Sequence, residues 1–150
     1  MTFPARIAIA TRNAHKVHEI RAICAEWPVT FVDADDRWPV VEETGATYLE
    51  NAFLKARAVA AATGLPALAD DSGIEVDALG GAPGPRSARY AGEDASDAEN
   101  LRALLAAIAG VPAMGRTARY RCVVVLCEPD GRELIAEGVC EGTVASRPRG

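Results

Sequence analysis

Long apolar runs, signal-peptide features and metal-type cysteine spacings are all lacking in this chain of 150 residues. No apolar run approaches the ~20 residues of a membrane span, and Met1–Pro4 leads into an apolar stretch without a signal-peptide pattern. We therefore expect a cytoplasmic protein with no membrane partner. The cysteines have no Cys-x-x-Cys spacing, so we expect reduced, mostly buried thiols and no zinc site. They are Cys24, Cys122, Cys127 and Cys140.

Positive charge is also scarce. The formal net charge is −5 at pH 7, which argues against a nucleic-acid partner. Lys16 and Lys55 are the only lysines among 16 basic residues. Lysine is a compact point charge that suits a phosphate group, although two stray lysines also arise by chance. A polyanionic ligand would meet repulsion unless a cation mediated its binding, which points to Mg²⁺.

Length and composition predict a single domain over residues 1–150. The chain is 25% charged and 49% hydrophobic, so it carries no signature of disorder. A chain of this length buries about 68–70% of its unfolded surface. No internal repeat or linker divides it.

Hydrophobic periodicity predicts an α/β protein. Residues 7–10 form a short apolar strand, and a helical pattern follows that reaches Trp27. A capping box at Thr47 begins a second helix, which ends at Gly64. Crossover helices of this kind are typical of parallel strands.

The second half of the chain predicts a helix and a hairpin. Another capping box, at Ser96, begins a helix that ends at Gly110. Strands over 119–127 and 132–140 are joined by a short turn, so they must be antiparallel. The predicted sheet is therefore mixed.

Two adjacent carboxylates, Asp70 and Asp71, follow an apolar run at 66–69. We expect a buried strand with the carboxylates in the loop at its end, where α/β proteins tend to place ligand sites. Neighbours on an extended chain point to opposite sides. One carboxylate is thus expected to orient the loop, and the other to bind metal or activate water. An Asx-turn with a Ser-Gly corner is the competing interpretation.

A polar turn, Thr11–Lys16, lies between the first strand and the first helix. The unpaired amides and the dipole at a helix start attract anions. Thr11 and Asn13 can donate to phosphate oxygens, and Lys16 adds a full charge. The turn lacks the glycines and the Gly-Lys-Ser/Thr ending of a Walker A loop. We expect His15 and His18 to be solvated, not metal ligands.

A second acidic pair, Glu42 and Glu43, precedes the helix that carries Lys55. Two acidic pairs and two lysines are the parts needed to hold a metal ion and a polyphosphate together. Surface charge at a solvated helix end is the competing interpretation of the glutamates.

Several segments together resemble the inosine triphosphate pyrophosphatase family, which converts inosine, deoxyinosine and xanthosine triphosphates to the monophosphate and pyrophosphate. They occur in the expected order along nearly the whole chain. The segments are Thr11–Lys16, Glu42–Ala52, Ala69–Gly73, Gly80–Gly84 and Ser87–Tyr90. The resemblance implies an elongated mixed β-sheet with flanking helices, two lobes around an active-site cleft, and a homodimer.

The resemblance also implies roles for individual residues. Asp71 is expected to be the catalytic general base and a Mg²⁺ contact, and Glu42 a further metal contact. Lys55 and Ser72 are expected to contact the substrate. The triphosphate-binding turn is expected to comprise Thr11, Arg12, Asn13, Ala14, His15 and Lys16.

Two features depart from the family pattern. His15 stands where the family usually has a small residue, often glycine. In the family, a Gly-Phe-Gly-Tyr-Asp-Pro segment, a lysine and Ser-His-Arg grip the base, and they follow the position of Gly150. The chain is therefore expected to be a fragment, or a natural truncation, that lacks this C-terminal segment.

The sequence thus predicts a Mg²⁺-dependent enzyme that hydrolyses non-standard purine nucleoside triphosphates (ITP, dITP and XTP) at the α–β bridge and so cleanses the nucleotide pool. Two alternatives remain. One is a pyrimidine or modified-nucleotide pyrophosphatase of related fold. The other is a nucleotide-binding module without turnover.

Overall fold

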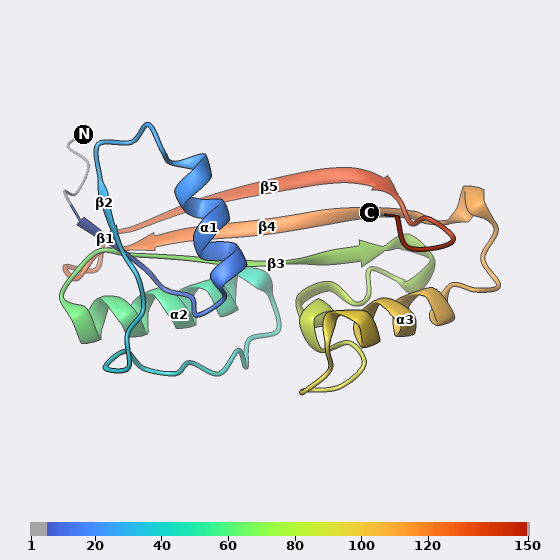
Figure 1. Cartoon of the computed structure of the whole chain (residues 1–150), viewed down its shortest axis with the longest axis horizontal. Coiled ribbons are helices and arrows are strands. Elements are labelled where there is room, and N and C mark those ends of the chain that lie inside the picture. The colour runs from blue at the N-terminus through green and yellow to red at the C-terminus, as the bar shows by residue number, and fades with distance from the viewer. Residues whose placement is uncertain (1–5, 150) are drawn as a thin grey trace. The chain divides into compact units, whose positions relative to one another are not determined.

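The computed structural model describes residues 6–149 (Figure 1); Met1–Pro4 and Gly150, on which expectations were based above, lie outside them. The strands are β1 (Arg6–Ile9), β2 (Thr30–Val32), β3 (Ala67–Val76), β4 (Thr117–Cys127) and β5 (Glu133–Thr143). The α-helices are α1 (Ala14–Ile23), α2 (Tyr48–Thr63) and α3 (Asp97–Ala107). Short 3₁₀ helices are η1 (Asp77–Leu79), η2 (Gly84–Arg89) and η3 (Ala113–Gly115).

The strands form one five-stranded sheet in the order β2-β1-β3-β4-β5. β1 pairs in parallel with β2 and with β3, and Ala8 lies opposite Ala67. β4 and β5 run in opposite directions (Figure 1) and are joined by a turn in which the Glu128 amide donates to the Arg132 carbonyl oxygen at 2.8 Å. The predicted mixed sheet with flanking helices is confirmed.

Helix boundaries follow the capping residues. At α2, the Thr47 side chain accepts from the Glu50 backbone amide, and the Glu50 side chain accepts from the Thr47 backbone amide. The helix ends at Gly64, whose φ of 67° is the left-handed conformation that glycine adopts without strain. α1 ends at Ile23 and does not reach Trp27.

One sequence prediction about strands is wrong, and one strand was missed. The carboxylates at 70 and 71 lie within β3, which continues to Val76, and not in a loop. The apolar run at 66–69 was too short to reveal that the polar residues after it also pair. The short strand β2 was not predicted, since its three residues carry no periodicity.

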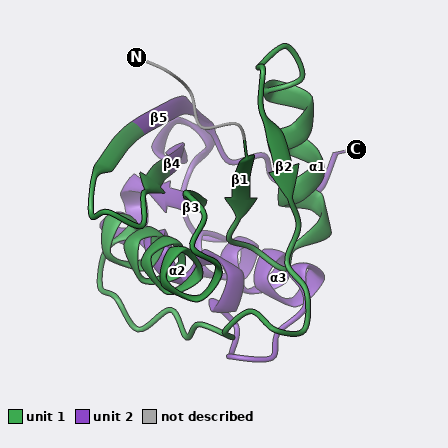
Figure 2. Cartoon of the chain, turned by 90° about the vertical axis from the view of Figure 1, so that its left-hand side faces the viewer, with its two compact units in different colours: residues 1–71, 123–136 green, residues 72–122, 137–150 purple. Residues whose placement is uncertain are grey.

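The chain divides into two compact units, coloured in Figure 2. Unit 1 comprises residues 1–71 and 123–136, and unit 2 comprises residues 72–122 and 137–150. In unit 1, α2 packs small residues such as Ala52 and Ala56 against Ala67, Ala69 and Val125. In unit 2, Leu104 and Ile108 pack with Val76 and Ala118. Each unit therefore has its own hydrophobic core.

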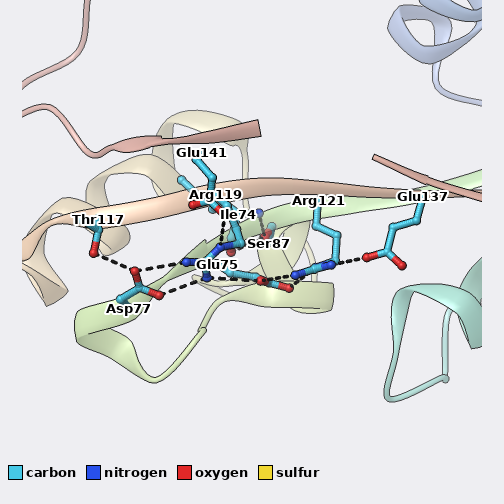
Figure 3. Close-up of polar contacts among 9 residues, drawn as sticks. All are labelled: Ile74, Glu75, Asp77, Ser87, Thr117, Arg119, Arg121, Glu137 and Glu141. Atoms are coloured by element: carbon cyan, nitrogen blue, oxygen red, sulfur yellow. Dashed lines mark hydrogen bonds and ion pairs between the residues drawn. The ribbon is translucent and has the colours of Figure 1, made fainter. Parts of the chain in front are cut away.

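Unit 2 also carries a ladder of ion pairs (Figure 3). Arg119 donates to Asp77 at 3.0 Å and to Glu141 at 2.9 Å. Arg121 donates to Glu75 at 2.9 Å and also to Glu137. Arg119 also lies 3.7 Å from a carboxylate oxygen of Glu75. Each guanidinium thus contacts at least two carboxylates of the unit.

The cysteines form no disulfide among the residues described. Cys24 and Cys127 are buried and Cys122 is half-buried, whereas Cys140 is exposed. Burial raises the pKa of the Cys127 thiol to about 11. Within residues 6–149, no helix combines the length and apolar character needed to cross a membrane.

Candidate active site

Strand β3 presents Asp70 and Asp71 to different partners, as the alternation of side chains along a strand requires. Both residues are buried, with exposed fractions of 8% and 4%. Lys16 Nζ on α1 donates to Asp70 Oδ2 at 2.7 Å. Asn51 Nδ2 on α2 donates to Asp71 Oδ2 at 3.0 Å. The structure therefore brings the first helix, the second helix and β3 together at this pair.

Lys55 lies one helical turn after Asn51 on α2, and its side chain is 11% exposed. Its ammonium donates to Glu43 Oε1 at 2.6 Å and to the Asp70 carbonyl oxygen at 2.6 Å. Lys55 thus links the acidic loop before α2 to the strand that carries the carboxylates. Its contact with substrate stays a prediction.

Of the two glutamates in that loop, the structure brings Glu43 to the cluster. Glu43 is half-buried, and its charge contributes to raising the pKa of Asp71. Glu42 is exposed, so its metal contact stays a prediction without support from its position. The sequence could not distinguish the two glutamates, because the direction of each side chain depends on the path of the loop backbone.

The environment of the cluster shifts the pKa values of Asp71 and Lys16. Burial raises the pKa of Asp71, although the hydrogen bond from Asn51 opposes the shift. For Lys16, burial acts to lower the pKa, but the charge of Asp70 and its hydrogen bond outweigh this and the pKa is raised. Lys16 is therefore cationic at neutral pH, and Asp71 is the carboxylate that takes up a proton more readily than usual.

The polar turn before α1 is held by its own side chains. Asn13 is the N-cap, and its Oδ1 accepts from the amides of His15 at 2.9 Å and Lys16 at 3.4 Å. Thr11 Oγ1 accepts from the Asn13 amide at 3.2 Å. These side chains shape the turn and orient Lys16, and the His15 side chain is exposed.

The remaining predicted site residues have other surroundings. Arg12 donates to the carbonyl oxygens of Asp35 at 3.2 Å and Trp38 at 2.9 Å, which fastens the turn to that segment. Ala14 is the exposed first residue of α1, and Ser72 is half-buried directly after Asp71. Their roles in binding stay predictions.

An open groove of about 460 Å³ lies along another face of α1. Its helical residues recur at spacings of three and four, so they share one face, and Lys16 does not line it. The lining residues are Thr11, Arg12, Ala14, Val17, His18, Arg21, Asp33 and Ala34. The carboxylate cluster is therefore not part of this groove.

The carboxylates of the cluster supply part of a coordination shell for Mg²⁺. No group of three or more His, Cys, Asp or Glu side chains within residues 6–149 is arranged to hold a metal ion by itself. Asp71 and Glu43 nevertheless offer the oxygen donors that Mg²⁺ prefers, and this ion is usually held by one or two carboxylates together with substrate phosphates and water. The residues fit a Mg²⁺ that arrives with a triphosphate, and they do not form a complete cage.

Sequence reasoning missed one residue of the cluster, Asn51. Its side chain is 0% exposed. The available signal was a polar residue directly after a capping box, on the apolar face of a strongly predicted helix. A buried amide requires partners, so this position predicts a polar contact but does not identify the partner.

Comparisons with known proteins identify the family of this chain. A model of the Ham1 family matches residues 7–150. The dITP/XTP pyrophosphatase of Syntrophobacter fumaroxidans is 53% identical over 146 residues, which are 96% of this chain and 62% of the relative. That of Geobacter sulfurreducens is 48% identical over 147 residues, which are 97% of this chain and 74% of the relative. The chain thus spans 62% to 74% of the length of these two relatives.

Solved structures give the same result. A HAM1 protein from Coxiella burnetii has 41% identity and a TM-score of 0.87, with coverage of 98% of this chain and 76% of that one. The nucleoside-triphosphatase / dITP/XTP pyrophosphatase of Mycobacterium abscessus has 37% identity and a TM-score of 0.80, with coverage of 97% and 77%. The resemblance stated from the sequence is confirmed, and the relatives carry the enzyme class that it implied. The chain belongs to the Ham1 family.

Proposed function

We propose that this chain is a Mg²⁺-dependent nucleoside triphosphate pyrophosphohydrolase that converts dITP, XTP and ITP to the monophosphate and pyrophosphate. The observation that carries the proposal is the cluster of Lys16, Lys55, Glu43, Asp70 and Asp71 beside a capped helix start. The names of the relatives, dITP/XTP pyrophosphatase, support the substrate class.

Asp71 is the general base of the proposed reaction. It is buried, its pKa is raised, and its side chain is held on a rigid strand. A base is most effective when its pKa lies near the working pH, so a raised carboxylate pKa favours proton uptake from water that attacks the α-phosphorus. The electron pair of the cleaved α–β bridge leaves with pyrophosphate.

The charged residues around Asp71 bind and orient the triphosphate. Lys16 stays cationic and projects from the turn expected to receive phosphate oxygens. Asp71 and Glu43 would hold Mg²⁺, which when bound neutralises charge on the phosphate oxygens. Lys55 fixes Glu43 beside β3, so the acid stays in reach of the ion.

A product assay tests the proposal. With Mg²⁺ and dITP, XTP or ITP, the protein should release pyrophosphate and the monophosphate in equal amounts, and chelation of the metal should abolish release. Orthophosphate and the diphosphate as products would overturn it. A panel that includes dATP, dUTP and dCTP separates the purine assignment from a pyrimidine or modified-nucleotide pyrophosphatase, and binding without turnover would indicate a non-catalytic module.

Three further features are part of the proposal. They are a location in the cytoplasm, assembly as a homodimer, and a single catalytic domain over residues 1–150. Gel filtration would test the second, and a single cooperative thermal unfolding transition would support the third.

A further inference from the structure

Both the oxygen and the nitrogen of the Asn51 side-chain amide form hydrogen bonds. The residue is 0% exposed, and a buried amide is costly unless it is hydrogen-bonded. Its Oδ1 accepts from the Gly45 amide at 2.8 Å, and its Nδ2 donates to Asp71 Oδ2 at 3.0 Å. One planar group therefore joins the acidic loop to the carboxylate.

Gly45 decides which way this amide faces. A backbone N–H only donates, so the oxygen of Asn51 must point toward Gly45 and the NH₂ group toward Asp71. Asp71 Oδ2 consequently receives a donor of fixed direction. If the Asn51 side-chain amide were flipped, its NH₂ group would face the N–H donor of Gly45, and its oxygen would face the carboxylate oxygen of Asp71.

The first turn of α2 makes this arrangement rigid. The backbone amide of Asn51 donates to the Thr47 carbonyl oxygen at 3.2 Å, and the backbone amide of Ala46 donates to Glu50 Oε2 at 2.7 Å. A Cβ on Gly45 would lie 2.7 Å from Asn51 Oδ1 and 2.6 Å from Glu50 Cβ. The loop thus packs against Asn51 so closely that no side chain fits at position 45.

A buried asparagine with two side-chain hydrogen bonds also follows the capping box of α3. Asn100 follows the capping box Ser96–Glu99 of α3, as Asn51 follows that of α2, and it is also buried, at 8% exposed. Its Oδ1 accepts from the Ala91 amide at 2.8 Å, and its Nδ2 donates to the Ala88 carbonyl oxygen at 2.8 Å. At α3 both partners are backbone groups, so that amide anchors a loop. At α2 one partner is a carboxylate.

We infer that Asn51 is a positioning residue, which holds the Asp71 carboxylate in the orientation that the reaction requires. The inference rests on the proposed function, because that function makes Asp71 the base. Misplacement of a catalytic group by about 1 Å can cost roughly 10²-fold in rate. Asn51 acts through Asp71, so its loss lowers kcat and leaves KM nearly unchanged.

Asn51→Leu is the main variant, and Asn100→Leu is its matched control, since both remove a buried two-ended amide after a capping box. Both should lower the midpoint of thermal unfolding. Per folded molecule, Asn51→Leu should lower kcat for dITP by roughly 10²-fold with KM within threefold, whereas Asn100→Leu should leave kcat unchanged. Equal kcat losses in the two variants would show that Asn51 is only a loop anchor.

A double-mutant cycle tests whether Asn51 acts through Asp71. In an Asp71→Asn background, Asn51→Leu should cost no more than about threefold in residual turnover, because residues that act as a unit are strongly non-additive. A full further loss of roughly 10²-fold would overturn the inference.

A third measurement does not depend on activity. Asn51→Asp at pH 8 places two carboxylates together and should lower the midpoint of thermal unfolding. The exchange variant N51D/D71N restores one donor and one acceptor, so it should recover most of the lost midpoint. Failure to recover would refute the pairing. If the unaltered protein releases no pyrophosphate from any triphosphate, the proposed function fails. Recovery of the unfolding midpoint in the exchange variant would then show only a structural contact between residues 51 and 71. The inference that Asn51 positions a catalytic base would fail together with the proposed function.

Discussion

Asp70 and Asp71 are consecutive in β3, yet Asp70 Oδ2 accepts from the Lys16 ammonium at 2.7 Å and Asp71 Oδ2 accepts from the neutral amide of Asn51 at 3.0 Å. Burial raises the pKa of Asp71, although the hydrogen bond from Asn51 opposes the shift. The two carboxylates therefore have different partners, a cation at Asp70 and a neutral amide at Asp71. The proposed function assigns the role of general base to Asp71.

Asp71→Asn should lower kcat for dITP by roughly 10²–10⁴-fold, the range for a positioned acid or base. The protein should still fold, although residue 71 lies in a strand, because an asparagine can turn its oxygen toward Asn51 and keep the hydrogen bond. Steady-state kinetics and thermal unfolding measure the two effects. Asp70→Asn, as the comparison, should affect KM more than kcat. If Asp70→Asn abolished turnover and Asp71→Asn were nearly silent, the roles would be reversed.

The sequence was sufficient where local chemistry decides structure. Thr47 and Ser96 begin helices because their capping boxes satisfy amides that the helix cannot. Gly64 ends α2 because glycine tolerates a positive φ. The turn at 128–131 makes β4 and β5 neighbours, since so short a connection allows only an antiparallel pair.

The sequence was insufficient where distant residues meet. Polar residues in the middle of β3 look like a loop until a lysine from α1 and an asparagine from α2 reach them. Likewise, only the path of the backbone decides that Glu43 approaches Lys55 while Glu42 stays exposed. The motif signalled that a carboxylate cluster exists, but tertiary structure selected its members.

Gly45→Ala should destabilise the protein by about 1–3 kcal/mol, the usual cost of overpacking. The added methyl group would lie 2.6 Å from Glu50 Cβ and 2.7 Å from Asn51 Oδ1. Gly110→Ala is the control, because a methyl group there would meet nothing within 4 Å. Urea denaturation compares the two. A Gly45→Ala protein as stable as Gly110→Ala would show that the loop moves aside at little cost.

The ladder in Figure 3 should make stability depend on pH in the acid range. The hydroxyl of Thr117 and the guanidinium of Arg119 lower the pKa of Asp77 below 3.8. The folded state therefore binds fewer protons than the unfolded state between the two values, so this stabilisation is complete above about pH 4 and is lost as pH falls further. Arg119→Met should flatten the decline of the unfolding midpoint between pH 5 and pH 2, and exposed Arg147→Met should not. Parallel pH curves for the two variants would show that the ladder contributes nothing.

The two lysines should fail in different ways when they are replaced. Lys55 donates to two protein acceptors, Glu43 and the Asp70 carbonyl oxygen, and is 11% exposed. Lys16 donates to Asp70 from the turn and is 24% exposed. We therefore expect Lys55→Met to act mainly on folding, with a loss of about 1–3 kcal/mol, because the half-buried Glu43 and the Asp70 carbonyl oxygen both lose a donor.

Lys16→Met should act mainly on binding. A hydrogen bond to a charged group contributes about 1.5–3 kcal/mol, so the inhibition constant of inorganic tripolyphosphate with Mg²⁺ should rise roughly 10- to 100-fold. The unfolding midpoint of this variant should stay closer to that of the unaltered protein than the midpoint of Lys55→Met does. Measurement of both quantities in both variants separates the roles, because each variant then serves as the control for the other. If Lys55→Met raised the inhibition constant more than Lys16→Met and left the midpoint unchanged, the phosphate-binding charge would come from α2 and not from the turn before α1.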